Sequence, residues 1–387
     1  MACNEYTAAK LLQIHAFICR HGASLEGGTV KWGKCGLAIF LLEYARQGKG
    51  ENEGQLAYEL LQMGLADIDT LEADPGAESL ADLGRLLQFF ASQDVLPFDA
   101  EELLLDLDHY LKVQLLRLIQ SRNFDLVTGA LNPAAYLLDR HISRGGKSDL
   151  LLALIQALAD SAVYPTPEQV CWPSTLFKDA RVYLGLAHGS AGILLFISRC
   201  QQAGLESAVG RRLLDQGTRF LQAQYLAGHP IAFPVVAGHL PAKVQLGWCY
   251  GDLGVAYGLL VAGKALMATD ISALAEHISL LLGQQLDHPD AWPDAGLAYG
   301  ISGTTAIYQA FYRETGNPAF AVIANQALTR LASFEQAIST SCGFQAHYRV
   351  NVPGADWGLI TGLAGIGLAL LADQQQDFRL LHKILIL

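Results

Sequence analysis

Charged side chains are scarce in this chain of 387 residues, since Asp, Glu, Lys and Arg together make up 16% of it. The 26 Lys and Arg residues are outnumbered by 37 Asp and Glu residues, which gives a formal net charge of −11. Nucleic acids and anionic membrane surfaces bind proteins through clusters of Lys and Arg. The composition therefore argues against both as partners.

Long uninterrupted hydrophobic runs are also missing. Three uncharged and largely apolar stretches, 182–198, 295–312 and 357–372, each contain glycine and polar residues. A membrane-spanning helix needs about 20 consecutive, mostly apolar residues, so we expect no transmembrane segment. The first residues carry Glu5 and lack the apolar centre of a secretory signal. The seven cysteines are odd in number and show no disulfide-framework spacing, so we expect a reduced, cytoplasmic protein.

Apolar residues are abundant, at 51%, and they follow a repeat. A turn of glycine or other small residues precedes an apolar helical segment at seven places, which begin at Gly33, Ala81, Gly129, Gly189, Gly251, Gly300 and Gly362. Amphipathic segments such as 99–120 and 205–225 lie between these places, with their charges on one face. The pattern predicts one all-α domain over residues 1–387. We expect an α/α toroid, or barrel, of seven helix pairs with an apolar inner ring and a half-exposed outer ring.

An open solenoid of helix pairs is the alternative, but it would expose the apolar inner helices unless it closed. Closure would bring the seven turns to one end, where the inner helices begin with unpaired N–H groups and partial positive charge. We therefore expect the chemistry at that end. Two proline-containing segments, 163–177 and 228–243, cannot form continuous helix. They are expected to fold over the fourth and fifth turns.

The fifth turn, Gly-Trp-Cys-Tyr-Gly-Asp-Leu-Gly at 247–254, carries the most varied chemistry. Taken alone, Cys249 has a simple structural interpretation as an inert buried thiol. Trp248 has one as a packing residue. Asp252 stands in the first turn of the next helix, where a carboxylate commonly accepts backbone N–H groups, so we expect it to cap that helix.

Four segments resemble the lanthionine synthetase C-like (LanC-like) cyclases. They are GLAHGSAGI at 185–193, GWCYGDLGVAYGLLVAGKAL at 247–266, AGLAYGISGTTAI at 295–307 and LITGLAGIGLALL at 359–371, and the resemblance covers essentially the whole chain. Members of this family are α/α toroids that add a peptide Cys thiol to dehydroalanine or dehydrobutyrine, which gives a thioether ring. The resemblance implies a precursor peptide as partner and suggests a lanthipeptide dehydratase as a second one.

In the family, a zinc ion held by a Cys of the fifth turn and a Cys-His pair of the sixth binds and deprotonates the thiol. The resemblance assigns the first zinc ligand to Cys249. The sixth turn has Ala298 and Tyr299 where the pair should stand, so two of the three ligands are replaced. Catalytic zinc needs about three protein ligands, so we expect zinc to bind weakly or not at all. Cys342 and His347 are the alternative donors, and both would have to reach the same end of the ring.

The same resemblance implies the other site residues. His188 matches a fourth-turn histidine that is a candidate proton donor, and Asp125 matches a third-turn carboxylate that orients or charges a histidine. Tyr250 follows the fifth-turn ligand and completes the candidate catalytic residues, whereas Trp248 and Tyr299 are candidates for substrate binding. Structural roles remain as alternatives: His188 would donate to a loop carbonyl, and Asp125 would cap its own turn.

Three functions are compatible with these observations. The first is a LanC-like protein that has lost zinc-dependent catalysis and acts as a peptide-binding or complex-forming subunit in the modification of ribosomally made, lanthipeptide-type peptides. The second is a cyclase that works without the zinc triad, with His188 as acid or base and Tyr299 hydrogen-bonding an oxyanion. The third is a divergent toroid enzyme acting on glycans or isoprenoids, an analogy of fold alone. The sequence leaves open whether the protein is an enzyme.

Overall fold

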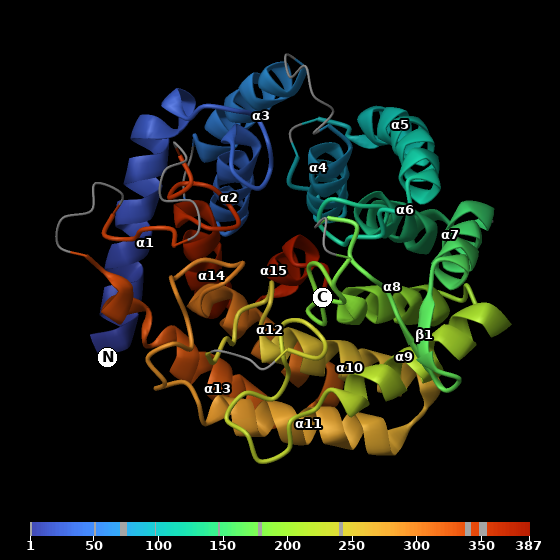
Figure 1. Cartoon of the computed structure of the whole chain (residues 1–387). Coiled ribbons are helices and arrows are strands. Elements are labelled where there is room, and N and C mark those ends of the chain that lie inside the picture. Colours follow the sequence, from blue (N-terminus) through green and yellow to red (C-terminus); the bar gives the residue numbers. More distant parts are fainter. Residues whose placement is uncertain are drawn as a thin grey trace. The chain divides into compact units, whose positions relative to one another are not determined.

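The computed structural model describes residues 2–49, 52–69, 76–96, 98–145, 148–176, 180–239, 243–336, 342–347 and 354–387. These residues form fifteen α-helices, two short 3-10 helices and one two-stranded sheet (Figure 1). The prediction of an all-helical architecture is therefore confirmed in its main feature. No helix in the described part of the chain is long and apolar enough to cross a membrane.

Largely buried helices alternate along the chain with half-exposed ones, as the repeat predicts. The largely buried helices are α2 (Lys34–Arg46), α4 (Gly76–Ala91), α6 (Leu131–Arg144), α8 (Ser190–Gln202), α10 (Asp252–Leu266), α12 (Ile301–Thr315) and α14 (Leu363–Gln375). The half-exposed helices are α1 (Ala2–His21), α3 (Glu53–Asp69), α5 (Glu101–Gln120), α7 (Asp149–Asp160), α9 (Ala208–Ala223), α11 (Thr269–Gly283) and α13 (Pro318–Leu328). The remaining elements are the 3-10 helices Gly22–Ser24 and Leu331–Phe334, the strands β1 (Val163–Thr166) and β2 (Gln169–Cys171), and α15 (Arg379–Ile384).

Glycine opens most of the buried helices because the chain passes close to itself there. The first glycine of the motif is the N-cap residue of five of these helices, at Gly33, Gly189, Gly251, Gly300 and Gly362. The second glycine faces a backbone carbonyl. A Cβ on Gly192 would lie 2.1 Å from the oxygen of Leu186, and one on Gly303 would lie 1.9 Å from that of Leu297. Such approaches admit only a residue without a side chain.

The prediction for the second turn is wrong. Residues 81–84 lie inside α4 and do not precede it. Asp82 of this segment forms an ion pair with Lys31, and both side chains are buried. A single glycine is tolerated within a helical pattern, and Gly84 therefore marks no boundary.

Segment 163–177 contains a β-hairpin that the sequence did not predict. Strands β1 and β2 pair antiparallel, with Val163 opposite Cys171 and Thr166 opposite Gln169. The prolines of this segment exclude helix, as expected, but they are compatible with a short extended strand at an edge. The last residue of the segment lies outside the described residues, as do residues 240–242 of the second proline-containing segment.

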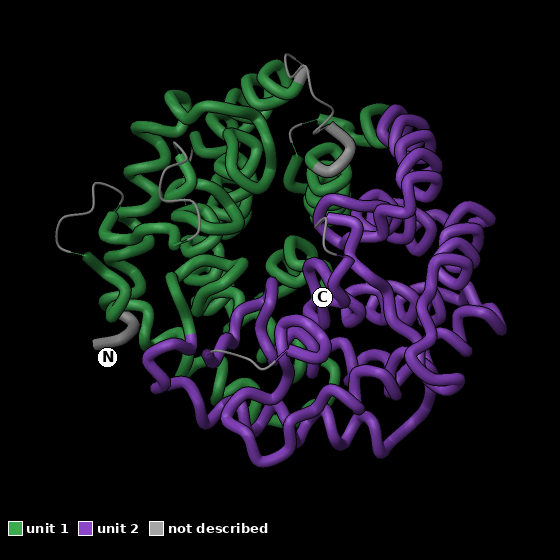
Figure 2. The backbone as a smooth tube through the Cα atoms, viewed as in Figure 1, with its two compact units in different colours: residues 1–104, 292–387 green, residues 105–291 purple. Residues whose placement is uncertain are grey.

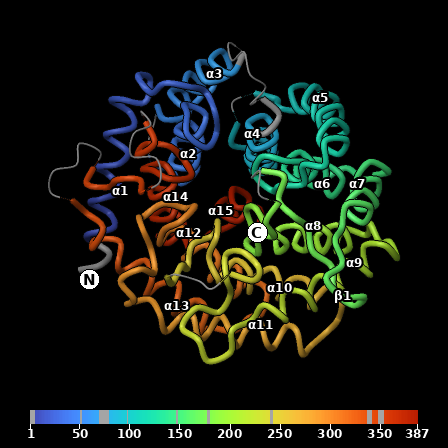
Figure 3. The backbone as a smooth tube through the Cα atoms, viewed as in Figure 1, coloured from blue at the N-terminus to red at the C-terminus, as the bar shows by residue number. Residues whose placement is uncertain are grey.

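The chain divides into two compact units (Figure 2): unit 1 holds Met1–Leu104 and Trp292–Leu387, and unit 2 holds Leu105–Ala291. In unit 1, α2 packs on α3, α12 packs on α13, and α14 contacts both α1 and α2, so that segments from the two ends of the sequence lie side by side (Figure 3). In unit 2, α8 contacts α6, α9 and α10, and α10 packs on α11. That the 387 residues form a single domain stays a prediction.

Candidate functional site

Three loops of unit 2 meet at one place, and each supplies a side chain that the sequence singled out. Asp125 lies in the loop before α6, His188 in the loop before α8, and Cys249 and Tyr250 in the loop before α10. The second and third of these loops are in direct contact, since a Cβ on Gly185 would lie 2.7 Å from the carbonyl oxygen of Cys249. Tertiary packing within unit 2 thus gathers the four predicted residues.

Asp125 uses its two carboxylate oxygens differently. Oδ1 accepts the backbone N–H groups of Val127 and Thr128, both at 2.8 Å, and so closes the turn before α6. Oδ2 accepts a hydrogen bond from Nδ1 of His188 at 2.7 Å. The side chains of Asp125 and His188 are 5% and 12% exposed. The capping role and the role at His188, which the sequence left as alternatives, are therefore both filled by Asp125.

The imidazole of His188 is held between a carboxylate and a thiol. Burial by itself would lower the pKa of His188, but hydrogen bonds to Asp125 and Cys249 and their charges outweigh burial and raise that pKa to about 10. A histidine with this pKa carries protons on both ring nitrogens at neutral pH. His188 is therefore suited to donate a proton, and it can accept one only after it has lost its own.

Two aromatic residues, Trp248 and Tyr250, flank Cys249 in the sequence of the loop before α10. The ring of Tyr250 lies 5.3 Å from that of His188, centroid to centroid, and so covers one side of the imidazole. Trp248 and Cys249 are only 4% and 3% exposed. The burial of Trp248 agrees with packing inside unit 2, and its role in substrate binding stays a prediction.

Asp252 does not cap α10, contrary to our expectation. The N-cap residue of that helix is Gly251, and the carboxylate of Asp252 instead accepts the backbone N–H groups of Ala232 and Phe233 at 2.9 and 3.2 Å. Burial raises the pKa of Asp252 to about 7, against the lowering effect of these two hydrogen bonds. The residue thereby ties the second proline-containing segment to the start of α10.

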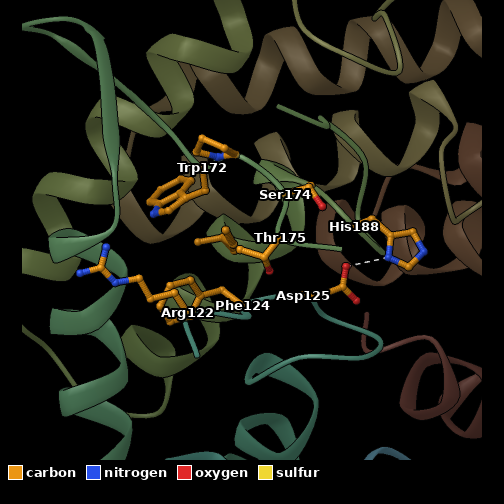
Figure 4. Close-up of a pocket in the computed structure, with 10 residues that line it drawn as sticks. Arg122, Phe124, Asp125, Trp172, Ser174, Thr175 and His188 are labelled. Atoms are coloured by element: carbon orange, nitrogen blue, oxygen red, sulfur yellow. Dashed lines mark hydrogen bonds and ion pairs between the residues drawn. The ribbon is translucent and has the colours of Figure 1, made fainter. Parts of the chain in front are cut away.

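A small pocket with a cavity volume of about 30 Å³ opens beside the Asp125–His188 pair (Figure 4). Its walls come from the chain after α5, the chain after β2 and the start of α8, and besides the pair they include Arg122, Phe124, Trp172, Ser174, Thr175 and Ile193. The expected position of segment 163–177 near the fourth turn is thus confirmed for its residues 172–175. Sequence reasoning missed Arg122 and Phe124, for which the only signal was their place just before Asp125.

Two comparisons with known proteins identify the family and the fold. The family model described as "Lanthionine synthetase C-like protein" matches residues 25–386. The chain belongs to this family. Among solved structures, it is similar to nisin cyclase, with a TM-score of 0.71 and 15% sequence identity over 97% of this chain and 96% of that chain. This likeness confirms the predicted α/α-toroid fold class, and a search of curated proteins finds no match.

Two of the three positions to which the resemblance assigns zinc ligands carry other residues in this LanC-like chain. Cys249, in unit 2, supplies one thiol. Ala298, in unit 1, has no donor atom in its side chain, and its backbone N–H donates to the carbonyl of Ile360 at 2.9 Å. The neighbouring Tyr299 offers a phenol, a poorer zinc ligand than thiolate or imidazole. Among the described residues, no group of three or more His, Cys, Asp and Glu side chains could hold a metal ion.

The alternative donors of this LanC-like chain belong to different local networks. The thiol of Cys342 donates to the carbonyl of Gln13 in α1, at 3.6 Å. The backbone N–H of His347 donates to the carboxylate of Asp294 at 3.1 Å. Cys342 is thus held against α1, whereas His347 is held at the loop before α12.

Proposed function

We propose that this LanC-like protein binds dehydrated precursor peptides of the lanthipeptide type and lacks the zinc-dependent activation of the attacking thiol. One observation carries the proposal. Asp125, His188 and Cys249 are in contact beside a pocket of unit 2, whereas Ala298 and Tyr299 stand where the family resemblance implies zinc ligands. In this proposal the residues for handling the peptide are present, whereas two of the three residues for activating its thiol are replaced.

The chemistry of thioether formation separates these two tasks. The sulfur of a peptide thiolate forms a bond to the β-carbon of a dehydroalanine, the double-bond electrons move toward the carbonyl as an enolate, and a proton is then added at the α-carbon. His188, with its pKa raised to about 10, is suited to give that proton and is a poor acceptor for the thiol proton at neutral pH. A free thiol with a pKa near 8.5 is only a few per cent thiolate at pH 7. The chain therefore keeps a proton donor for protonation of the enolate at the α-carbon.

A second candidate is a cyclase that works without zinc. The protonated state of His188 favours it, because a proton donor placed next to the enolate would accelerate addition by the small fraction of thiolate already present. Hydrolysis of a glycan is not favoured, because that reaction uses two carboxyl groups. Asp125 is the sole carboxylate among the residues that line the pocket.

A synthetic peptide with one dehydroalanine, one cysteine and a fluorescent label tests the proposal. Binding is followed by fluorescence anisotropy, and cyclisation by the loss of the free thiol, with zinc and with a chelator. We expect the natural protein to bind the peptide without accelerating cyclisation. The double variant Ala298→Cys, Tyr299→His should bind it equally well and cyclise it only with zinc.

Two controls separate the outcomes of this experiment. His188→Gln added to the double variant should abolish its cyclisation but leave its zinc content unchanged. Acceleration by the natural protein in the presence of chelator would overturn the proposal in favour of the zinc-free cyclase. Failure of the natural protein to bind the peptide would overturn the peptide-binding role itself. A lanthipeptide dehydratase is the second partner we propose, and co-purification of a tagged chain with such an enzyme would test it.

A further inference from the structure

Arg122 is an exposed, positively charged residue on the wall of the pocket. Among the described residues, its guanidinium takes part in no ion pair and no hydrogen bond. In Figure 4 it lies at the opposite end of the pocket from His188, with Phe124 and Thr175 between them. A cation in this position is available to a ligand in the pocket.

The backbone at Arg122 supports a role for its side chain. Its φ of 56° falls in the left-handed region, just after the end of α5, where its N–H donates to the carbonyl of Ile119 at 3.0 Å. Glycine is the usual residue at such a position because it adopts this conformation without strain. Arg122 adopts this conformation although its guanidinium forms no ion pair or hydrogen bond with the described residues.

The guanidinium of Arg122 has no carboxylate partner in the pocket. Asp125 is the sole carboxylate among the lining residues, and its Oδ2 already accepts a hydrogen bond from Nδ1 of His188 at 2.7 Å. The chain as a whole carries a net charge of −11. The charge of Arg122 is opposite in sign to that of the protein, and it is complementary to an anionic group.

Several of the other lining side chains are apolar, beside the polar Ser174 and Thr175. Phe124, Trp172 and Ile193 are buried, and the indole N–H of Trp172 donates to the carbonyl of Leu158 at 2.8 Å, which fixes the ring. Walls of this kind suit the methylene groups that precede a carboxylate in a peptide side chain. The pocket therefore combines apolar side chains with a cation at one end and the imidazole of His188 at the other (Figure 4).

We propose that Arg122 binds a carboxylate of the substrate peptide and thereby places the neighbouring dehydrated residue at His188. The inference rests on the proposed function and adds the substrate class: peptides with a carboxylate close to the reacting residue. An acidic side chain and the C-terminal carboxylate of the peptide would present the same group. The experiment distinguishes these two sources.

The test uses fluorescently labelled peptides in which dehydroalanine is followed by Glu or by Gln, each with a free or an amidated C-terminus. Dissociation constants are measured by anisotropy for the natural protein, Arg122→Ala, Arg122→Gly and Arg122→Lys. The glycine variant suits the left-handed backbone and guards against loss of folding. Arg211→Ala, an exposed arginine of α9, is the matched control.

We expect the natural protein to bind the Glu peptide about tenfold more tightly than the Gln peptide, as for a hydrogen bond between charged groups. The alanine and glycine variants should lose this preference and bind the Gln peptide as before, whereas Arg122→Lys should keep part of it and Arg211→Ala all of it. Tighter binding of the peptides with a free C-terminus than of the amidated ones, with no difference between Glu and Gln, would identify the terminal carboxylate as the group bound. Equal binding of all four peptides by the natural protein, or a preference that survives in Arg122→Gly, would overturn this inference and leave the proposed function standing. Binding of none would overturn both.

Discussion

Nδ1 of His188 lies 2.7 Å from Oδ2 of Asp125, although 63 residues separate the two in sequence. The contact joins the loop before α8 to the loop before α6 within unit 2. It also fixes which way the imidazole faces and keeps it protonated. The first prediction follows from this pair.

Asp125→Asn should lower the pKa of His188 and destabilise the protein by about 3 kcal/mol at pH 6, as for loss of one partner of a buried ion pair. The pKa of His188 is raised in the folded protein to about 10, from 6.5. The stabilisation is therefore complete below about pH 6.5 and is lost as the pH rises through 10. Urea unfolding of both proteins should show a difference that is largest at pH 6 and shrinks toward pH 10.

His277→Gln, on the exposed face of α11, serves as the control and should leave the pH dependence unchanged. The titration of His188 itself can be followed by NMR of its ring protons. A midpoint below pH 7 in the natural protein would contradict the prediction.

Zinc content is the second prediction. We expect the purified protein to carry far less than one zinc ion per chain, because Ala298 offers no donor atom and Cys249 alone cannot replace three ligands. The variant Ala298→Cys, Tyr299→His should carry about one. Elemental analysis checks this, and near-stoichiometric zinc in the natural protein that disappears in Cys249→Ala would show the prediction to be wrong.

The third prediction concerns the second glycine of the repeat. Gly303→Ala should destabilise the protein by about 3 kcal/mol, the upper range for overpacking, because its Cβ would lie 1.9 Å from the oxygen of Leu297. Gly254→Ala should cost less, since the nearest atom there is the oxygen of Trp248 at 3.1 Å. The measurement is the midpoint of urea unfolding.

Gly54→Ala is the matched control for this series. Gly54 lies in α3, and a Cβ added there would meet nothing within 4 Å. Its replacement should stabilise the protein by about 0.5–1 kcal/mol, because alanine loses less backbone freedom on folding. Equal effects at Gly54 and Gly303 would refute the close approach of the chain at the turns.

Thiol reactivity gives the fourth prediction. Burial raises the pKa of Cys35 and of Cys200 to about 12 and that of Cys171 to about 11, which suppresses their thiolates. Cys19 is exposed. Iodoacetamide at pH 8 should therefore label Cys19 well before the other three, which should react only after unfolding in urea. Peptide mapping by mass spectrometry identifies the labelled sites, and faster labelling of Cys200 than of Cys19 would falsify the prediction.

The helices follow from local sequence because their causes are local. A glycine turn followed by an apolar run predicted α8, α10 and α12, since the first glycine ends an extended segment and the second admits a carbonyl a few residues away. The same pattern failed at residues 81–84, where Gly84 lies within α4. A glycine within a helix and a glycine at the start of a helix are distinguished by the residues that pack against them. The sequence next to the glycine does not specify those residues.

For the candidate site too, the sequence names some features and the tertiary structure decides others. Family resemblance named Asp125, His188 and Cys249, but only the tertiary structure joins them and raises the pKa of His188, because that shift depends on charges and burial contributed by other loops. Asp252 shows the limit of local reasoning. Its position in the first turn of α10 predicts a cap, whereas the fold brings the backbone of Ala232 within reach and the carboxylate binds there. Backbone preferences act over a few residues, and the partner of a buried polar group is set by whatever the fold places beside it.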